Sequence, residues 1–393
     1  MASSRRRFPI GTAVPLVAGA YTYVGFPLIA SWLARRERPR SFEYDELPTV
    51  SVIIPALNES LHIADKVRNS LDNGYPPDLI EVIVVDDHSD DDTAQLAKDA
   101  GAHVVRRAFR GGKCEAINTG VDEALSEIIV VTDANGYLND GAIRRVVDQF
   151  ADPEVGLVSG AKDPVGATAH GVGERVYWQF EGGIRHQIGT MGVLDGADGA
   201  VFAFRRDWFQ PIPAGVLNDD FYLALSALSD GHRVTHAQGA YATEDVSPTV
   251  RQEFRRRARI SAGIWQGSLR FLSLADPRRG KVAFVFTSHR LLRSLVMPCL
   301  LPILLVSTVR NRRSVIPRLV LLGELLTYGG AAAGAVTGQG ALGVPLQFTM
   351  LNVAAIRGGV RHLLGRQRVT WERIPRELGG GAPSRAPRAD SAA

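Results

Sequence analysis

The sequence predicts an α/β protein with a doubly wound, mainly parallel sheet and flanking transmembrane helices. Between residues 49 and 135, apolar runs rich in β-branched residues alternate with helical segments, which is the pattern of a parallel sheet. Two of these runs end abruptly in acids, at Asp87 and at Asp133. Continuous apolar runs of this kind are typical of strands buried on both faces. Long apolar segments at both ends of the chain predict the membrane helices.

Composition limits the class of protein. The chain has 393 residues, enough for one or two domains, and a net charge of only +4, which gives no argument for a nucleic-acid partner. The basic residues are nearly all arginines beside apolar segments, a pattern that suits membrane-flanking loops and anionic lipid head groups. Cys114 and Cys299 are the only cysteines, so neither a disulfide framework nor a cysteine metal site is expected.

The first membrane helix is expected over residues 10–33, a run long enough to cross about 30 Å of hydrocarbon. A signal peptide is the alternative, but the length of the run, Pro15, Pro27 and the lack of a small-x-small cleavage site argue against it. Arginines precede the run at 5–7 and follow it from residue 35, so the positive-inside rule barely decides its orientation. We assign residues 1–40 to this helix and its flanks.

The α/β domain is expected over residues 41–270. Strands are predicted over residues 50–55, 81–87, 102–105 and 128–133. A helix follows the first strand, with Asn58 or Ser60 as its N-cap. The acids after Asp87 favour the start of a second helix, and the Gly111-Gly112 pair precedes a third.

The strand ends predict a site for a nucleotide and a metal ion. Ligands of open α/β sheets bind beyond the carboxyl ends of the strands, where Asp133 and Asn135 follow the fourth strand. Two oxygen-bearing side chains at i and i+2 can approach one hard cation and its phosphates. The glycine pair lets the backbone approach an anion that Lys113 can neutralise. Neither the G-x-G-x-x-G fingerprint nor a P-loop is present.

Seven short motifs occur in one order across residues 48–270, at 54–59, 85–89, 112–118, 132–135, 198–206, 218–221 and 256–260. Their order and spacing resemble the family-2 glycosyltransferases of GT-A fold. The flanking apolar segments resemble the membrane-bound bacterial polysaccharide-synthesis branch of that family. The resemblance implies a GT-A fold and transfer of a sugar from a nucleotide-sugar.

The resemblance also implies roles for donor-side residues. The base and ribose would be held by Pro55, Ala56 and Glu59, with Asp87 hydrogen-bonded to the base and Lys113 near the nucleotide. Asp133 and Asn135 match the D-x-D pair that binds ribose, diphosphate and a cofactor ion, Mg²⁺ or Mn²⁺. Asn135 departs from the usual second aspartate, and a neutral ligand binds a hard cation less strongly than a carboxylate does.

Asp220 matches the catalytic base of the family. A sugar hydroxyl is a poor nucleophile until a positioned carboxylate takes its proton, which agrees with this role. One base opposite the leaving group gives displacement with inversion. Adjacent Asp219 is not expected to face the acceptor from the same regular element, and capping of the helix over 221–229 is its alternative role. We assign Asp198, Gly199 and Asp219 to the acceptor region.

The family has Q-x-x-R-W where this chain has Arg256, Arg259 and Ile260. Arg256 and Arg259 are expected to bind the nucleotide-sugar, with Arg259 on the diphosphate. A tryptophan face stacks on a sugar ring and isoleucine does not, so single transfer is favoured over chain extension unless Trp265 compensates. A helix-like stretch contains Tyr177, Trp178, Glu181 and Arg185, which could line an acceptor cleft, although core packing is the favoured role for the two aromatics.

The C-terminal region, residues 271–376, is expected to return to the membrane. Residues 289–293 are expected to form an amphipathic approach at the interface, and 291–309 and 315–336 to span, with Glu324 facing protein. The shorter run 341–356 leaves spanning and re-entrant structures open. Residues 377–393 are rich in Gly, Pro, Ser and Ala and are expected to be disordered.

The sequence therefore predicts an inverting, metal-dependent glycosyltransferase in exopolysaccharide or cell-envelope synthesis. Its partners would be a nucleotide-sugar, UDP being favoured by the resemblance, a lipid-linked or growing glycan acceptor, and membrane lipids, with no nucleic acid. Nucleotide-sugars are made in the cytosol, so the catalytic domain of a multi-pass inner-membrane protein should face it. The alternatives are a processive synthase, an inactive homologue that serves as an assembly partner, and a lipid-carrier transporter.

Overall fold

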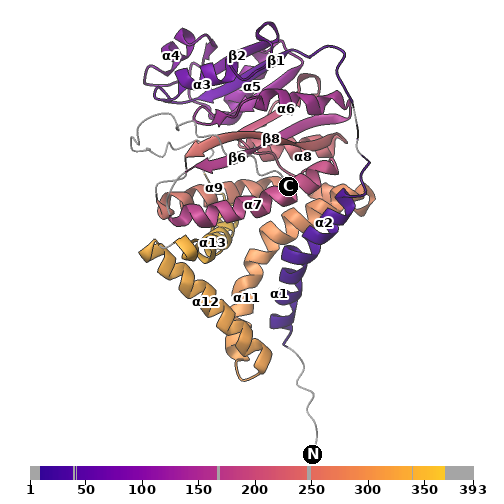
Figure 1. The fold of residues 1–393 in the computed structure, drawn as a ribbon. Helices are drawn as coiled ribbons and strands as arrows, with labels where there is room; N and C mark the ends of the chain where they lie inside the picture. Colours follow the sequence, from indigo (N-terminus) through magenta and orange to yellow (C-terminus); the bar gives the residue numbers. More distant parts are fainter. Residues whose placement is uncertain are drawn as a thin grey trace, which may run out of the picture.

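The structure is a computed structural model that describes residues 9–38, 40, 42–165, 169–245, 249–338 and 340–367. Its described strands form one eight-stranded sheet in the order β3-β2-β1-β4-β7-β6-β8-β5. Figure 1 shows the sheet and its helices at one end of the molecule and a group of long helices at the other. The predicted arginines at 5–7 and disordered tail at 377–393 lie outside the described residues.

One half of the sheet is parallel, as the sequence predicts. It contains β1 (Val50–Ala56), β2 (Ile80–Asp86), β3 (His103–Arg106) and β4 (Ile128–Thr132), connected by α3 (Ile63–Leu71), α4 (Thr93–Asp99) and α5 (Lys113–Glu123). Every residue of β1 and of β4 is buried, which explains why these runs are continuously apolar and do not alternate.

The other half of the sheet is mixed. It contains β5 (Tyr137–Leu138), β6 (Val155–Val165), β7 (Val201–Arg205) and β8 (Arg233–Asp245). β7 runs antiparallel to β4, with Thr132 opposite Val201. The carboxyl end of β4 therefore meets the amino end of β7, and this places the residues after Thr132 beside those before Val201.

A layer of helices lies beneath the mixed half of the sheet. In Figure 1, α7 (Ala169–Thr190) and α9 (Val250–Arg270) separate the sheet from the long helices, with α8 (Asp219–Ser229) above them. α6 (Ala142–Asp148) covers the sheet farther from this layer. α13 (Gly343–Leu363) crosses α9 so closely that a Cβ at Gly358 would lie 2.6 Å from the Ala258 carbonyl oxygen. The run predicted at 341–356 thus becomes a helix that packs on the catalytic domain.

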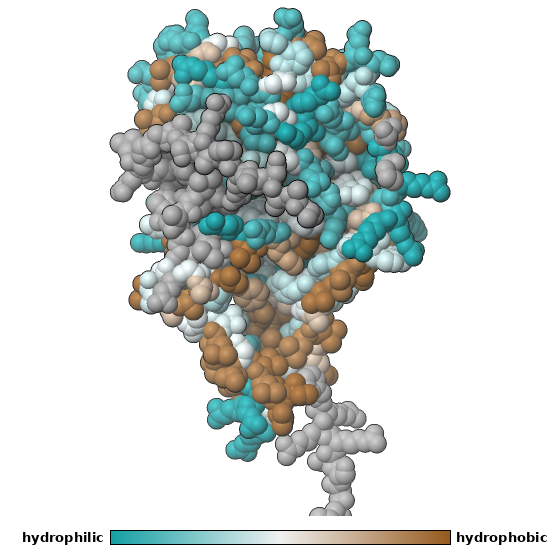
Figure 2. Space-filling view, viewed as in Figure 1, coloured by the Kyte–Doolittle hydropathy of each residue, from teal (hydrophilic) through white to brown (hydrophobic). Residues whose placement is uncertain are grey.

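Three described helices are long and apolar enough to cross a membrane, namely Ile10–Ala34, Lys281–Arg310 and Val315–Thr337. The first joins α1 (Ile10–Ala20) and α2 (Phe26–Ala34) through a π-helical turn, and the last is α12. Figure 2 shows a hydrophobic surface over this end of the molecule. The exposed apolar side chains there include Ile303, Val306, Ile316, Leu319 and Leu326.

Residues 289–293, expected to form an amphipathic approach at the interface, lie within a longer helix that packs against the α/β domain. Lys281–Arg310 is one continuous helix, with α10 (Lys281–Val285), a π-helical part (Phe286–Val296) and α11 (Met297–Arg310). His289 and Arg290 are buried, and Asp195 accepts hydrogen bonds from His289 Nδ1 at 2.9 Å and Arg290 Nη2 at 3.1 Å. These polar side chains therefore bind a buried acid of the α/β domain. The sequence pattern alone does not tell whether such side chains contact a buried acid or lipid head groups.

Asp195 ties the helix Lys281–Arg310 to the α/β domain. Burial by itself would raise its pKa, but Arg290 and His289 outweigh burial and hold the pKa of Asp195 below its ordinary value. A second pair joins the same helix to α7, where Arg293 Nη1 donates to Glu181 Oε2 at 2.7 Å. The helix is thus anchored at two points before it leaves the catalytic domain.

We predict that Asp195→Ala lowers the free energy of unfolding by about 3–5 kcal/mol, because Arg290 would remain buried without its carboxylate partner. The midpoint of thermal unfolding in detergent, followed by tryptophan fluorescence, measures the loss. Asp65→Ala is the matched control, since it removes an exposed pair with Arg68 and should change stability by no more than about 0.5 kcal/mol. Equal midpoints for the two variants would contradict the anchoring role.

Candidate active site at the sheet edge

A lysine joins two acids at the edge of the sheet. Lys113, the first residue of α5, places its Nζ 2.8 Å from Asp133 Oδ1 and 3.2 Å from Asp219 Oδ2. Burial would lower the pKa of Lys113, but Asp133 and Asp219 raise it well above its ordinary value. The lysine is therefore a fixed positive charge between the end of β4 and the start of α8.

Asp220 lies beside this cluster. Its Oδ1 accepts a hydrogen bond from the backbone of Phe221 at 2.7 Å, and its Oδ2 lies against Gly199, where a Cβ would sit 3.3 Å away. Burial, together with the neighbouring Asp219, raises the pKa of Asp220 to about 7. A carboxylate with this pKa is suited to accept a proton near neutral pH.

Both acids at the start of α8 line one cavity, so their adjacent positions do not keep either of them out of it. They occupy the first two positions of the helix, where side chains are not yet enclosed by a preceding turn. Asp219 differs from Asp220 in its ion pair with Lys113. Its first role is therefore to hold the lysine, and Asp220 is the acid nearer to Gly199.

The cavity connects the acidic cluster with the apolar helices. Its volume is about 570 Å³. One end is lined by Lys113 and Asp133, and the other by side chains of three helices that the sequence places far apart, namely Tyr23, Pro298, Phe348 and Leu351. A ligand in this cavity can therefore touch the polar cluster and the apolar helices at once.

α9 supplies arginines to the cavity. Arg256 and Arg257 both donate to Glu253, which is buried, and both line the cavity. Arg259 lies closer to the acids, and its Nε is buried with no hydrogen-bond partner in the part of the chain that the structure describes. Burial lowers the pKa of Arg259, although Asp219 partly offsets this effect. A guanidinium with one buried, unsatisfied donor is suited to bind an anionic group.

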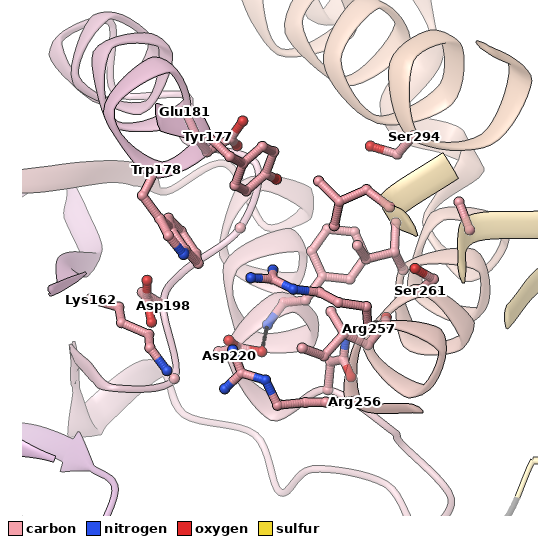
Figure 3. Close-up of a pocket in the computed structure, with 18 of the residues that line it drawn as sticks. Lys162, Tyr177, Trp178, Glu181, Asp198, Asp220, Arg256, Arg257, Ser261 and Ser294 are labelled. Atoms are coloured by element: carbon pink, nitrogen blue, oxygen red, sulfur yellow. Dashed lines mark hydrogen bonds between the residues drawn. The ribbon is translucent and has the colours of Figure 1, made fainter. Parts of the chain in front are cut away.

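The aromatic side chains of α7 face the cavity, so the expected core-packing role is wrong. Tyr177 and Trp178 line it, and the Arg257 guanidinium lies 5.7 and 5.6 Å from their ring centres. Figure 3 shows Trp178 pointing from α7 toward Asp198, with Asp220 and Arg256 on the other side of the cavity. Glu181 and Arg185 also line it.

Trp265 does not compensate for the missing tryptophan of the arginine motif. Its Nε1 donates to the Ala355 carbonyl at 3.2 Å, and its ring packs against Gly359 of α13. Ile260 does line the cavity, in keeping with its place in the motif. Trp178 of α7, a helix that contains none of the seven motifs, instead lines the cavity.

The loops after β1 and β2 form a second, adjacent part of the site. Asn58 adopts a left-handed conformation with φ 55°, donates its backbone N–H to Ser89 Oγ and accepts from the Asp90 backbone at 2.8 Å. The expectation that Asn58 or Ser60 caps the helix is wrong, because α3 begins only at Ile63. Asn58 therefore joins the loops after β1 and β2 through two hydrogen bonds.

Asp87 positions the glycine pair before Lys113. Its carboxylate accepts hydrogen bonds from Arg107 Nη1 at 2.9 Å, from the Gly111 amide at 2.9 Å and from the Gly112 amide at 2.7 Å. Gly112 has φ 90°, a conformation that favours glycine. A carboxylate has roughly four acceptor positions, so Asp87 retains room for one more donor, such as a nucleotide base.

The structure divides the candidate residues into two groups. One group lines the cavity: Lys113, Asp133, Asp198, Gly199, Asp219, Asp220, Arg256 and Arg259. The other lies outside the cavity lining: Pro55, Ala56, Glu59, Asp87 and Asn135. Sequence reasoning missed the ion pair between Lys162 of β6 and Glu244 of β8, which also lines the cavity. No motif marked it, because its members are 82 residues apart.

The residues present fit a metal ion that substrate helps to bind. Among the described residues, no group of three or more His, Cys, Asp or Glu side chains could hold a metal ion by itself. Mg²⁺ usually takes one or two protein ligands and completes its shell with phosphate and water. Asp133 and Asn135 can supply that share, and the Lys113 ammonium on Asp133 Oδ1 shows that this carboxylate accommodates a cation. Burial raises the pKa of Asp133 despite Lys113, so further positive charge would be favourable there.

Comparison with known proteins bears on the family and the fold. Residues 51–212 match the family described as Glycosyl transferase family 2. A solved mannosyltransferase from Pyrobaculum calidifontis, in complex with GDP-Man and Mn²⁺, superposes with a TM-score of 0.70 at 24% identity. The match covers 91% of this chain and 100% of that one, and it shows a shared GT-A fold.

Three curated relatives match parts of the chain. "Probable glycosyltransferase YdaM" of Bacillus subtilis is 26% identical over 58% of this chain and 58% of its own length. A beta-monoglucosyldiacylglycerol synthase of Trichormus variabilis is 33% identical over 36% of this chain and 32% of its own. A poly-beta-1,6-N-acetyl-D-glucosamine synthase of Staphylococcus epidermidis is 28% identical over 30% of this chain. The chain spans 29% of the length of that last relative, and less than two thirds of each of the three.

Proposed function

We propose that this chain, whose residues 51–212 belong to glycosyl transferase family 2, moves one sugar from a nucleotide-sugar to a lipid-linked or growing glycan acceptor with inversion. The observation that carries the proposal is one cavity that joins Lys113, Asp133 and Asp220 to the apolar helices. A sugar donor would lie at the end with Lys113 and Asp133, and an amphiphilic acceptor at the end with the apolar helices. The two would meet beside Asp220.

The donor would lie across the strand ends. Its base would contact the interlocked loops after β1 and β2, where Pro55, Ala56 and Glu59 remain the proposed base and ribose residues. Its diphosphate would lie between Lys113 and the unsatisfied Arg259. Asp133 and Asn135 would hold Mg²⁺ or Mn²⁺, which supplies charge stabilisation to the departing diphosphate.

Asp220 would act as the base. It takes the proton of an acceptor hydroxyl, whose oxygen then forms a bond to the anomeric carbon of the donor sugar. The bond from that carbon to the diphosphate breaks, and the nucleoside diphosphate leaves with the electron pair. Lys113 and Arg259 neutralise part of the charge that develops on it. Attack from the face opposite the leaving group inverts the anomeric configuration.

The acceptor would be positioned by α7 and α9. Tyr177 and Trp178 offer aromatic surfaces to a sugar ring, and the apolar lining beyond them suits a lipid chain. Ile260 in place of a stacking tryptophan favours single transfer. A relative named for polymer synthesis keeps the processive alternative open, and the chain length of the product decides between the two readings.

The helices support a membrane location. Three described helices have the length and composition of membrane spans, and two of them, Ile10–Ala34 and Lys281–Arg310, help to line the cavity. We place the protein as multi-pass in the inner membrane with its catalytic domain in the cytoplasm, where nucleotide-sugars are made. Proteolysis of sealed vesicles of known orientation tests this placement.

We predict that Asp220→Asn lowers kcat by about 10²–10⁴-fold, because the amide cannot accept the acceptor proton. Transfer from UDP- and GDP-sugars by purified protein, with a membrane lipid extract as acceptor, measures the loss. Asp230→Asn is the control, since Asp230 lies at the far end of α8 and should leave kcat unchanged. If Asp220→Asn kept wild-type kcat, Asp220 would not be the base. No turnover of any donor by the wild type would favour an inactive assembly partner.

The raised pKa of Asp220 predicts a pH dependence. Only the ionised carboxylate can take a proton, so kcat/KM should rise with pH up to about 7 and level off above it. Below that value the rate should fall about tenfold for each unit of pH. Initial rates at subsaturating donor between about pH 5.5 and 8.5 test this. A flat profile across that range would argue against a carboxylate base with a raised pKa.

Metal removal should abolish transfer reversibly. Chelation with EDTA is expected to stop the reaction, because Lys113 and Arg259 alone would not supply the positive charge that the ion brings to the departing diphosphate. Added Mn²⁺ or Mg²⁺ should restore it. Asn135→Asp adds a second carboxylate and should lower the metal concentration for half-maximal rate severalfold. Unchanged rates in EDTA would show that Lys113 and Arg259 suffice without metal.

A further inference from the structure

A buried lysine lies directly beneath the proposed metal loop. Lys66, on α3, has no exposed surface. Its Nζ donates to Thr132 Oγ1 at 2.8 Å and to the carbonyl oxygen of Gly136. Thr132 immediately precedes Asp133, and Gly136 immediately follows Asn135. The Lys66 amino group therefore binds both ends of the five-residue segment 132–136 that carries the two proposed metal ligands.

The hydrogen bonds of Lys66 continue through Thr132 to the segment before β7. Thr132 Oγ1, which accepts from Lys66, donates in turn to the Ala200 carbonyl at 2.7 Å. Ala200 adjoins Gly199, the residue that lies against Asp220 Oδ2 and Lys113 Nζ. One buried amino group thus connects the loop after β4 with the segment before β7 that borders Asp220.

The same face of α3 holds the residues that follow the turn. Asn69, one turn after Lys66, donates to the Leu138 carbonyl at 2.9 Å and accepts from the Leu138 amide at 2.8 Å. Asn73, two residues after the end of α3, bonds the Asn139 carbonyl and the Ile143 amide. Positions 66 and 69 share one helix face. α3 and the residues directly after it therefore fix the chain from Thr132 to Ile143, and Lys66 is their contact with the proposed ligands.

A lysine is a costly choice for this position. Ile63 and Val67 of α3 are fully buried and pack in the apolar core, so an apolar side chain of similar length would avoid the desolvation of an ammonium group. An apolar side chain could not satisfy Thr132 and the Gly136 carbonyl. Among side chains of this length, lysine provides three donors on a flexible stem.

We propose that Lys66 is a positioning residue that holds the turn of Asp133 and Asn135 in the conformation that receives a metal ion and a nucleoside diphosphate. The proposal rests on the proposed function of that turn. Residues that orient metal ligands through a second contact typically change metal affinity 10–100-fold when they are removed.

The first test uses the ligand-free protein. Lys66→Met keeps the length of the side chain and removes its donors. In hydrogen exchange of the purified full chain, the Gly136 and Leu138 amides of this variant should exchange at least about tenfold faster, while those of β1 and β2 stay unchanged. Ser70→Ala is the control, because its buried hydroxyl bonds only the Lys66 carbonyl within α3 and should leave both amides unchanged. A general loss of stability would instead speed exchange throughout the sheet.

The second test measures binding. Calorimetric titration with UDP and with GDP, each with and without Mn²⁺, should show binding to Lys66→Met weakened about 10–100-fold in the presence of Mn²⁺. If Lys66→Met does not fold, Thr132→Val takes its place, since it removes the link from Lys66 to Ala200 and keeps the shape of the side chain.

The outcomes separate the two proposals. Unchanged exchange at Gly136 and Leu138 would overturn the role of Lys66, whether or not nucleotide binds. Faster exchange there with unaltered Mn²⁺-dependent binding would also overturn it, because the turn would not need fixing to receive its ligands. Failure of the wild type to bind either nucleotide with Mn²⁺ would instead overturn the proposed function, and the role of Lys66 toward a diphosphate with it.

Discussion

The site depends on one ammonium group, that of Lys113 between Asp133 and Asp219. The carboxylates of Asp133, Asp219 and Asp220 lie close together and would repel one another without a cation among them. The lysine reaches this place because Asp87 fixes the glycine pair that precedes α5. Lys113 thus brings together the ends of β2 and β4 and the start of α8, and it leaves Asp220 as the acid whose pKa rises toward neutrality.

The sheet topology makes this convergence possible. In a wholly parallel sheet, the end of β4 would face only other strand ends. The antiparallel β7 returns beside it, with Val201 opposite Thr132, and delivers Asp198 and Gly199 to the same edge. The donor loops and the acceptor-side segment therefore meet across one strand pair. Buried polar groups hold the segment before β7 from both sides: Thr132 of β4 donates to the Ala200 carbonyl, and Ser159 of β6 accepts from the Asp198 amide, because an unpaired buried group would cost free energy.

The apolar helices pack against the α/β domain and help to line its cavity. Lys281–Arg310 begins against the sheet, where Asp195 and Glu181 bind its arginines, and ends as an apolar span. α13 crosses α9 at Gly358 and Gly359 and closes the same side of the cavity. The cavity is consequently lined by residues from both regions, as the proposed amphiphilic acceptor would require. This arrangement relates the apolar ends of the sequence to the chemistry of its middle.

The sequence by itself determined the strands β1 to β4, the GT-A class and the residues Lys113, Asp133 and Asp220, because continuous apolar runs and short motifs are local signals. Only the tertiary structure decided what those residues touch. It paired Lys113 with Asp219, which lies 106 positions away, turned Tyr177 and Trp178 into the cavity, and gave Asn58 to a loop contact. It also buried His289 and Arg290 on Asp195, and placed Lys66 beneath the turn of Asp133. Each of these contacts joins segments that are distant in the chain, and neither periodicity nor a motif specifies which distant polar group a side chain will meet.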